Sequence, residues 1–224
     1  MMVEFSPEAV ATVLSRAHAG GHTPYDWLVR GVGKRAQTVL DLSVDAGGAR
    51  SHLAADGRDV TCLGAAVLSG RLPQENGTVD AVTSVLGVTS RPDLPHALKE
   101  IARVLRPGGV LVALAPAMFP VSPADLQEVG LLVRHLKIRD TGLSRDHTVA
   151  ALPAAALRKV EHRRERYAFT VADRADARTL LSAIPFRSLD GTRLAAGVEH
   201  LVARIASRGP VTMPVPIRRL VAIK

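Results

Sequence analysis

The chain has 224 residues, 47% of them hydrophobic, and 29 Lys or Arg against 21 Asp or Glu give it a formal net charge of +8. This length and composition predict one globular domain with a sizeable core, and exclude a disordered or fibrous chain. The single cysteine, Cys62, excludes a disulfide framework and a multi-cysteine zinc site. No apolar run has the length of a membrane helix, and the first residues do not resemble a signal peptide, so we expect a cytoplasmic protein without membrane or metal.

Helices and short apolar strands alternate through the first half of the chain. The expected elements are helices at 7–19 and 25–32, a strand at 38–42, a helix around 50–56, strands at 59–63 and 79–85, a helix at 94–105 that ends at a Pro-Gly-Gly turn, and a strand at 110–114. This alternation predicts a parallel sheet with helices on both faces.

The second half has a looser pattern. We expect helices near 124–133 and 153–159, a strand at 161–171, helices at 173–182 and 194–207, and a closing strand at 212–223. This half also carries the whole charge excess, because residues 1–112 hold 11 basic and 11 acidic side chains, whereas residues 113–224 hold 18 and 10. Such an asymmetry indicates an anionic partner. The alternative explanation is a GC-rich genome, which raises the arginine content of its proteins.

Two segments carry a family resemblance. They are Leu72-Pro73-Gln74-Glu75-Asn76-Gly77-Thr78-Val79-Asp80-Ala81-Val82 and Ala97-Leu98-Lys99-Glu100-Ile101-Ala102-Arg103-Val104-Leu105-Arg106-Pro107-Gly108-Gly109. Together with the Tyr25-Asp26-Trp27-Leu28 segment before the first strand, they resemble class I S-adenosylmethionine-dependent methyltransferases of the type 11-like group. The resemblance implies an α/β, Rossmann-like fold with a mostly parallel sheet and an antiparallel last strand. It also implies a single domain with a helical cap (1–36), a cofactor-binding core (37–115) and a basic acceptor-side half (116–224).

The resemblance implies S-adenosylmethionine as cofactor and places its pocket at the end of the first strand. The implied cofactor-binding residues are Asp41, Ser43, Asp45, Gly47, Val85 and Leu86, and the implied substrate or lid contacts are His22 and Tyr25. Methyl transfer is a direct displacement that depends mainly on positioning, so no catalytic residue is predicted.

The cofactor motifs of this chain are degenerate. Ser43 and Asp45 stand where the family has its first two turn glycines, which let the backbone pass close to the cofactor. The second strand ends without the carboxylate that holds the ribose, and the family's adenine-side acid aligns with Leu68. Only 36 residues separate Leu42 from Val79. Two complete βαβ crossovers need more than that, so we expect one strand and one helix to be missing.

The C-terminal half resembles the rRNA guanine-N1 methyltransferases, without their four-cysteine zinc ribbon. The matching segments are Arg166-Tyr167-Ala168-Phe169-Thr170, Leu180-Leu181-Ser182-Ala183-Ile184-Pro185 and Pro210-Val211-Thr212-Met213-Pro214-Val215. Nine basic residues lie between Arg134 and Arg166 and suit the phosphates of an anionic partner such as RNA. The alternative is that these basic residues belong to a solvated helix face followed by a strand of alternating polar and apolar residues. The sequence is also compatible with a homodimer.

Three functions remain on these observations. The first is methyl transfer from S-adenosylmethionine to an unidentified acceptor, with RNA as one candidate. The second is a non-catalytic methyltransferase-like protein that has lost the cofactor and binds a protein or RNA. The third, a dinucleotide-dependent dehydrogenase, also requires a glycine-rich turn and a ribose acid, so the sequence favours it least.

Overall fold

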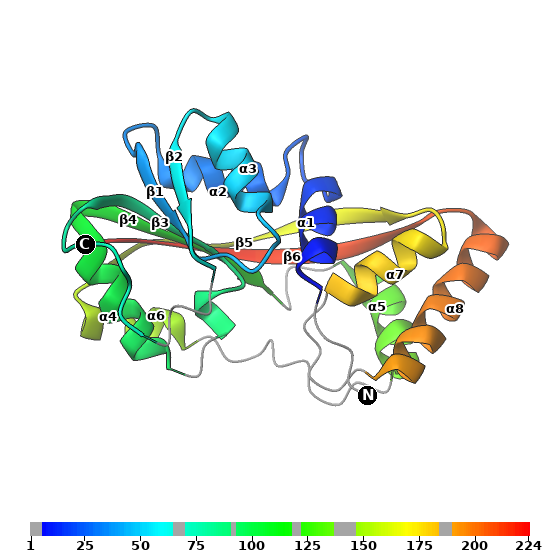
Figure 1. Ribbon diagram of the computed structural model, residues 1–224. Coiled ribbons are helices and arrows are strands. Elements are labelled where there is room, and N and C mark those ends of the chain that lie inside the picture. Colours follow the sequence, from blue (N-terminus) through cyan, green and yellow to red (C-terminus); the bar gives the residue numbers. More distant parts are fainter. Residues whose placement is uncertain (1–5, 65–69, 91–92, 118–121, 137–146, 184–189) are drawn as a thin grey trace.

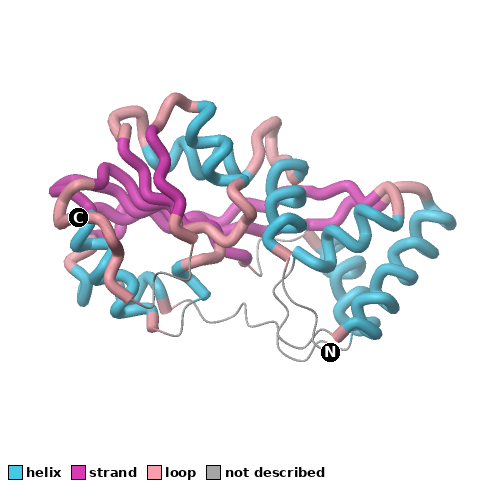
Figure 2. Tube along the Cα trace, viewed as in Figure 1, coloured by secondary structure: helices cyan, strands magenta, loops and turns pink. Residues whose placement is uncertain are grey.

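One six-stranded sheet organises the protein (Figures 1 and 2). The computed structural model describes residues 6–64, 70–90, 93–117, 122–136, 147–183 and 190–224. The strands are β1 (Thr38–Asp41), β2 (Asp59–Cys62), β3 (Val79–Val85), β4 (Leu105–Pro116), β5 (Arg158–Val171) and β6 (Val211–Ile223). They lie in the order β2-β1-β3-β4-β6-β5. The first four are mutually parallel, and β6 is antiparallel to both β4 and β5, which confirms the predicted sheet.

Helices cover both faces of the sheet, as the alternating pattern predicts. They are α1 (Pro7–Arg16), α2 (Pro24–Val32), α3 (Gly48–Ala55), α4 (Leu94–Val104), α5 (Pro123–Leu136), α6 (Thr148–Ala151), α7 (Arg174–Ala183) and α8 (Gly191–Arg208). Every residue of β3 is buried, because one face of it packs in a cluster with α1, α2 and α3 and the other in a cluster with α4 and α6. This two-sided burial explains why β3 reads as a continuous apolar run.

The sheet is shortened between β1 and β3, as the spacing predicts. The described residues of this segment form one helix, α3, and one strand, β2, before the chain enters β3. Among the described residues β2 is therefore an edge strand, paired with β1 alone. The described residues hold no strand beyond β2, where the family resemblance implies one.

Strands β5 and β6 form a long antiparallel ribbon that extends the sheet to one side (Figure 1). Its far end carries α7 and α8, which connect the two strands, together with α5. Gly197 of α8 faces this helical group, where an added Cβ would lie 2.5 Å from Leu136 of α5 and 3.0 Å from Leu181 of α7. A glycine at this position therefore lets the three helices approach one another closely.

Several predicted elements differ from the structure. The first helix ends at Arg16 instead of residue 19, and the strand expected at 110–114 already begins at Leu105, so that the predicted Pro-Gly-Gly turn lies within β4. The helix expected at 153–159 is instead a 3-10 turn at Pro153–Ala155, and Arg158 already belongs to β5. Ala156 ends the turn with a φ of +54°, and cross-strand pairing with β6 then outweighs the helix propensity of the alanines. The helix expected to continue to Leu105 ends at Val104, because Leu105 pairs with Val79 in the sheet.

An ion pair between Arg166 of β5 and Asp125 of α5 holds this helix against the ribbon. The Nε and Nη2 of Arg166 each donate to one carboxylate oxygen at 2.6 Å, and the Asp125 side chain is 6% exposed. The hydrogen bonds from Arg166, with those from Ser122, lower the pKa of Asp125 well below its ordinary value.

Asp125→Asn is therefore expected to cost about 2 kcal/mol at pH 7, since hydrogen bonds to charged groups contribute in this range. Because its pKa is lowered, ionised Asp125 stabilises the fold above the unfolded carboxyl pKa of about 3.9. This stabilisation is lost as the pH falls below that value. The difference between wild type and variant in urea denaturation should thus be constant from pH 7 to 5 and shrink below pH 4. A difference that grew on acidification would contradict this assignment.

In the part of the chain that the structure describes, every helix is too short or too polar to cross a lipid bilayer.

Candidate functional site

The predicted cofactor residues gather at the carboxyl ends of β1 and β3. Asp41, the last residue of β1, is 3% exposed and lies beside Thr83 of β3. Its Oδ1 accepts hydrogen bonds from the Ser43 hydroxyl at 2.6 Å and the Thr83 hydroxyl at 2.8 Å. Burial raises the pKa of Asp41, and these two hydrogen bonds oppose the rise. Thr83 was not predicted as a site residue, although its place beside Asp41 follows from the parallel register of the two strands.

Ser43 fastens the turn after β1 to β3. Besides its bond to Asp41, its hydroxyl oxygen accepts from the backbone N–H of Val85 at 2.9 Å. The backbone N–H of Val44 donates to the carbonyl of Val85 at 3.0 Å. A serine therefore takes up hydrogen bonds at the position where the family's first glycine stands, and the predicted wall residues Val85 and Leu86 lie buried next to it.

Asp45 is the more enclosed of the two carboxylates of the site. Its side chain is buried, with the residue 1% exposed, and its Oδ2 accepts from the Tyr25 hydroxyl at 2.7 Å and from the backbone N–H of Ala49 at 2.8 Å. The Tyr25 ring stacks on the His52 ring of α3, with centroids 4.5 Å apart. Burial and the adjacent Asp45 carboxylate both raise the pKa of Tyr25, so the phenol stays protonated and donates.

The glycines that remain in the turn differ in the space beside them. Gly47 has a φ of +85°, and a Cβ built on it would meet no atom within 4 Å. A Cβ on Gly48 would lie 2.2 Å from the Tyr25 hydroxyl oxygen. Tyr25 therefore fills the space over Gly48, whereas the space beside Gly47 is open.

One oxygen of this cluster has no partner. Asp45 Oδ1 is buried and accepts no hydrogen bond from any described residue. A buried carboxylate oxygen without a donor costs free energy, so it marks a position where a cationic or donor group would be stabilised.

His22, the other predicted lid residue, lies apart from this cluster against β5. Its Nε2 is 3.1 Å from Glu165 Oε1, and its ring meets the Tyr167 ring edge-on with centroids 5.7 Å apart. Tyr167 also donates its hydroxyl to Glu165 at 3.1 Å. The loop is pinned there by paired backbone hydrogen bonds between His18 and Ala168. Glu165 was not predicted, because it comes from a strand more than 140 residues away in the chain.

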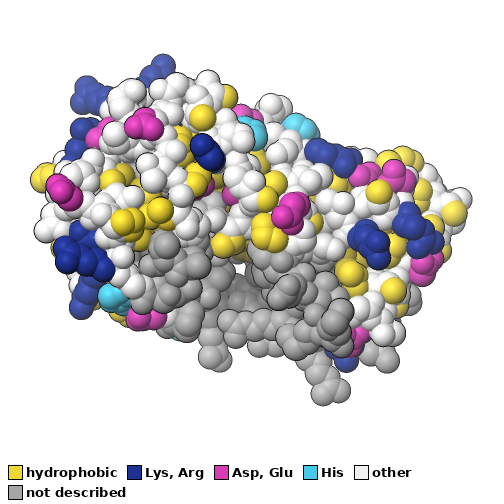
Figure 3. All heavy atoms as spheres, viewed as in Figure 1, with side chains coloured by type: hydrophobic (Ala, Val, Ile, Leu, Met, Phe, Trp, Pro, Cys, Tyr) yellow, Lys and Arg dark blue, Asp and Glu magenta, His cyan; other side chains and the backbone are white. Residues whose placement is uncertain are grey.

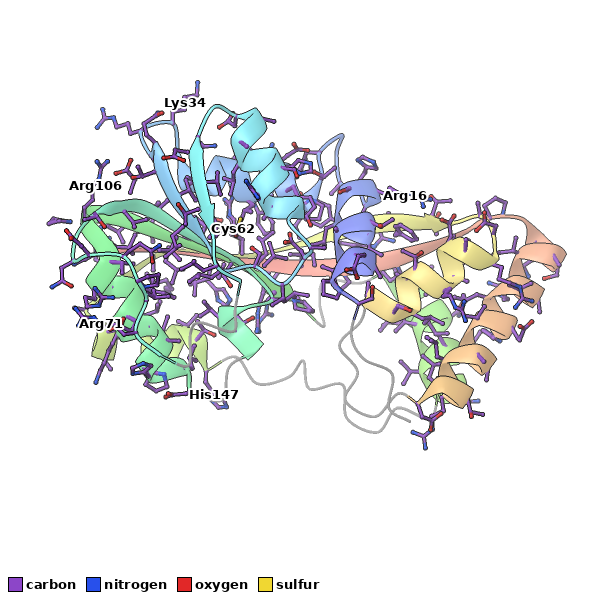
Figure 4. The ribbon with its side chains drawn as sticks, in the orientation of Figure 1. Arg16, Lys34, Cys62, Arg71, Arg106 and His147 are labelled. Carbon is purple, nitrogen blue, oxygen red and sulfur yellow. The ribbon has the colours of Figure 1, made fainter. Side chains whose placement is uncertain are left out.

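The end of β2 carries Cys62 and no carboxylate, as predicted (Figure 4). An apolar strand would bury a small residue such as cysteine, but β2 is an edge strand among the described residues and Cys62 is exposed. Its Sγ lies 3.6 Å from Asp41 Oδ2. Desolvation and the negative charge of Asp41 raise the pKa of the thiol to about 11.

Cys62 is consequently expected to alkylate slowly for an exposed thiol. With a pKa of about 11, roughly one thiol in a thousand is ionised at pH 8. The rate with iodoacetamide, followed by mass spectrometry, should rise steeply up to about pH 11, and Asp41→Asn should shift this rise to lower pH. The urea-unfolded chain is the control and should react as an ordinary thiol. Identical rates for folded and unfolded protein at pH 8 would contradict the assignment.

The described basic residues between Arg134 and Arg166 come from two elements, α5 and β5. Arg134 lies on α5, Arg166 is bound to Asp125, and the described remainder lie on β5, namely Arg158, Lys159, Arg163 and Arg164. Lys137, Arg139 and Arg145 are outside the described residues. On the face drawn in Figure 3, Lys and Arg side chains form separate groups with Asp and Glu among them.

Two further buried residues, Ser84 and Trp27, have structural roles. Ser84, in β3, accepts a hydrogen bond from the backbone N–H of Val88 at 2.8 Å, so its hydroxyl holds the turn that follows the strand. Trp27 is buried in the core. Within the described ranges, no three His, Cys, Asp or Glu side chains are arranged to hold a metal ion.

Known proteins share this architecture. Residues 13–109 match the sequence model of a methyltransferase domain family. Demethylmenaquinone methyltransferases of Bacillus cereus and Bacillus anthracis are 46% identical over 43 residues, which span 19% of this chain and 18% of theirs. The match thus covers less than a fifth of the length of these relatives.

Two solved structures extend the likeness over most of the chain. A candidate methyltransferase from Bacillus halodurans C-125 superposes with a TM-score of 0.52 at 13% identity, covering 90% of this chain and 98% of that one. A candidate methyltransferase from an antibiotic biosynthesis pathway of Anabaena variabilis gives 0.53 at 14% identity, covering 88% and 95%. At these identities the likeness shows the fold, which is the Rossmann-like fold of the methyltransferases.

Proposed function

We propose that this chain is an S-adenosylmethionine-dependent methyltransferase, with Asp45 as the counter-charge for the cationic methionine end of the cofactor. The observation that carries the proposal is the buried Asp45 Oδ1, which has no hydrogen-bond partner among the described residues. It lies at the carboxyl end of β1, the edge at which open α/β sheets bind ligands. The methyltransferase family match over residues 13–109 gives independent support.

The residues present fit the cofactor at its methionine end. The α-ammonium and sulfonium groups are cations, and a buried carboxylate with one unpaired oxygen suits either of them. The open space beside Gly47 supports the same position. At the ribose end, β2 supplies no carboxylate, so we infer that backbone groups replace it.

When bound, the cofactor supplies an electrophilic methyl group on its sulfonium sulfur. The chain's own contribution is to bind and position. The Tyr25 hydroxyl and the Ala49 N–H fix one carboxylate oxygen of Asp45 and leave the other to the ligand. The bonds that Ser43 makes to Asp41 and to Val85 N hold the turn in place, and buried Val85 and Leu86 exclude water. Orientation of this kind can supply much of the barrier reduction in a direct displacement.

Calorimetry with S-adenosylmethionine and S-adenosylhomocysteine tests this function. We expect both ligands to bind wild type, and Asp45→Asn to weaken the binding at least tenfold. Asp59→Asn is the matched control and should bind like wild type, because Asp59 is exposed at the amino end of β2, opposite the carboxyl ends that form the site. A larger loss for S-adenosylmethionine than for the uncharged thioether would assign Asp45 to the sulfonium. If folded wild type gave no heat signal at millimolar ligand, the proposed methyltransferase function would be refuted.

One observation favours the non-catalytic alternative. Ser43, Asp45 and Tyr25 already satisfy one another in the turn where the family keeps glycines, and a scaffold without cofactor would need no further change. The two functions differ in a measurable way, because the non-catalytic protein binds neither ligand in the calorimetric experiment.

For the acceptor, we propose an RNA that contacts the exposed basic side chains of β5. Arg158, Lys159, Arg163 and Arg164 support this proposal, whereas Arg166 is committed to Asp125. Binding of RNA through phosphate contacts falls linearly in log K against log salt. Fluorescence anisotropy with an RNA hairpin should therefore give a plot of log K against log salt whose slope Arg163→Gln reduces by about 1. A flat salt dependence would remove RNA as the acceptor.

A further inference from the structure

A groove between α5 and α8 lies in the helical group at the far end of the ribbon, away from the carboxyl end of β1 (Figure 1). Its volume is about 590 Å³, within the range of small-molecule sites. The lining residues are Leu126, Gln127, Gly130, Leu131, Arg134, Arg204 and Arg208. Neither the proposed cofactor site nor the basic strand β5 contributes to it.

The α5 wall of the groove is apolar and exposed. Leu126 and Leu131 are 52% and 46% exposed, and they are two of the three large hydrophobic residues exposed to this extent in the described chain. Gly130 lies between them, and a Cβ built on it would meet nothing within 4 Å, so the floor at this point is open. The opposite face of α5 is different, because Leu132 and Leu136 are buried in the core. Leu126 and Leu131 are thus available to a ligand.

The charged side chains among the described lining residues are all arginines. Arg204 and Arg208 are one turn apart on α8, and Arg134 is one turn beyond Gly130 on α5, so all three side chains reach the same groove. None of the described lining residues is acidic. Arginine is the side chain best suited to bind carboxylate or phosphate in a fork geometry.

We propose that this groove binds a small amphiphilic anion, with its apolar body on Leu126 and Leu131 and its phosphate or carboxylate on the arginines. The arginines are complementary in charge to the anionic group of such a ligand, and the apolar wall of α5 is complementary to its apolar body. We expect the groove to bind individual ligand molecules from solution, because it is lined by only seven described residues of two helices. The proposal does not depend on the methyltransferase function.

Octyl phosphate, below its micelle concentration, is the probe for a calorimetric test. We expect saturable binding to wild type, with inorganic phosphate and octanol each at least tenfold weaker. Arg134→Gln/Arg208→Gln and Leu131→Gln should each weaken octyl phosphate at least tenfold. Arg178→Gln, an exposed arginine on α7, is the matched control and should leave the affinity unchanged.

Thermal denaturation of each variant shows whether it is folded, and only folded variants are compared. Equal affinity of the groove variants and the Arg178→Gln control would overturn the proposal. So would binding of anionic vesicles or of an RNA hairpin at the groove without binding of octyl phosphate, since each would identify a different class of partner.

Discussion

Substitution of Gly48 by alanine is expected to destabilise the protein by about 3 kcal/mol, because the new methyl group would overlap the buried Tyr25 side chain. The added Cβ would lie 2.2 Å from the Tyr25 hydroxyl oxygen and 2.7 Å from its Cζ. The ring cannot move away freely, since it is fully buried and stacked on His52. Displacing the hydroxyl would also remove a donor from buried Asp45. Urea denaturation monitored by circular dichroism measures the loss.

A double-mutant cycle with Tyr25→Phe separates overlap from a general effect of alanine. Removing the hydroxyl relieves the closest contact, so Gly48→Ala should cost at least 1 kcal/mol less in the Tyr25→Phe background than in wild type. Gly130→Ala, in α5, is the control, because a Cβ there meets nothing and alanine favours a helix. It should be neutral or stabilising. Additive effects in the cycle would show that Tyr25 does not occupy the space over Gly48.

The sheet was predictable from the sequence because its central strand β3 is buried on two faces and the spacing between its strands is restrictive. The continuous apolar run of β3 and the apolar face of α4 are local patterns, and the structure follows both. The 36 residues between Leu42 and Val79 left room for one strand and one helix, a limit set by chain length alone. The start of β5 was not predictable in this way, since its pairing with β6 involves residues about 60 positions apart.

The site was predictable only in part. Asp41, Ser43 and Asp45 do gather at the carboxyl end of β1, as the parallel sheet requires. The sequence could not show that the Tyr25 hydroxyl bonds to Asp45, because this contact depends on how α2 packs across the turn. The same applies to Glu165, which reaches His22 from β5. Contacts between distant elements are set by packing, and a single sequence carries little information on them.

Arg219 is the residue on which we expect the second large effect, since it joins α2 to both strands of the ribbon. It is 7% exposed on β6, and its Nε and Nη2 donate to Glu161 of β5 at 3.0 and 2.7 Å. Its Nη1 donates to the carbonyl oxygen of Trp27, and its Cζ lies 4.6 Å from the centroid of the Trp27 ring. One guanidinium thus satisfies a carboxylate, a backbone carbonyl and an aromatic face.

Arg219→Met should therefore cost about 3 kcal/mol in urea denaturation, because it leaves Glu161 and the Trp27 carbonyl without their donor. Removing the unpaired charge as well, in Arg219→Met/Glu161→Met, should recover part of the loss, as replacing both members of a buried pair often does. Arg174→Met is the control, because its pair with Glu199 is 60% exposed on both sides and should not contribute measurably. If the double variant were no more stable than Arg219→Met, the loss would come from the Trp27 contacts of Arg219, and its main role would be to hold α2 on the sheet.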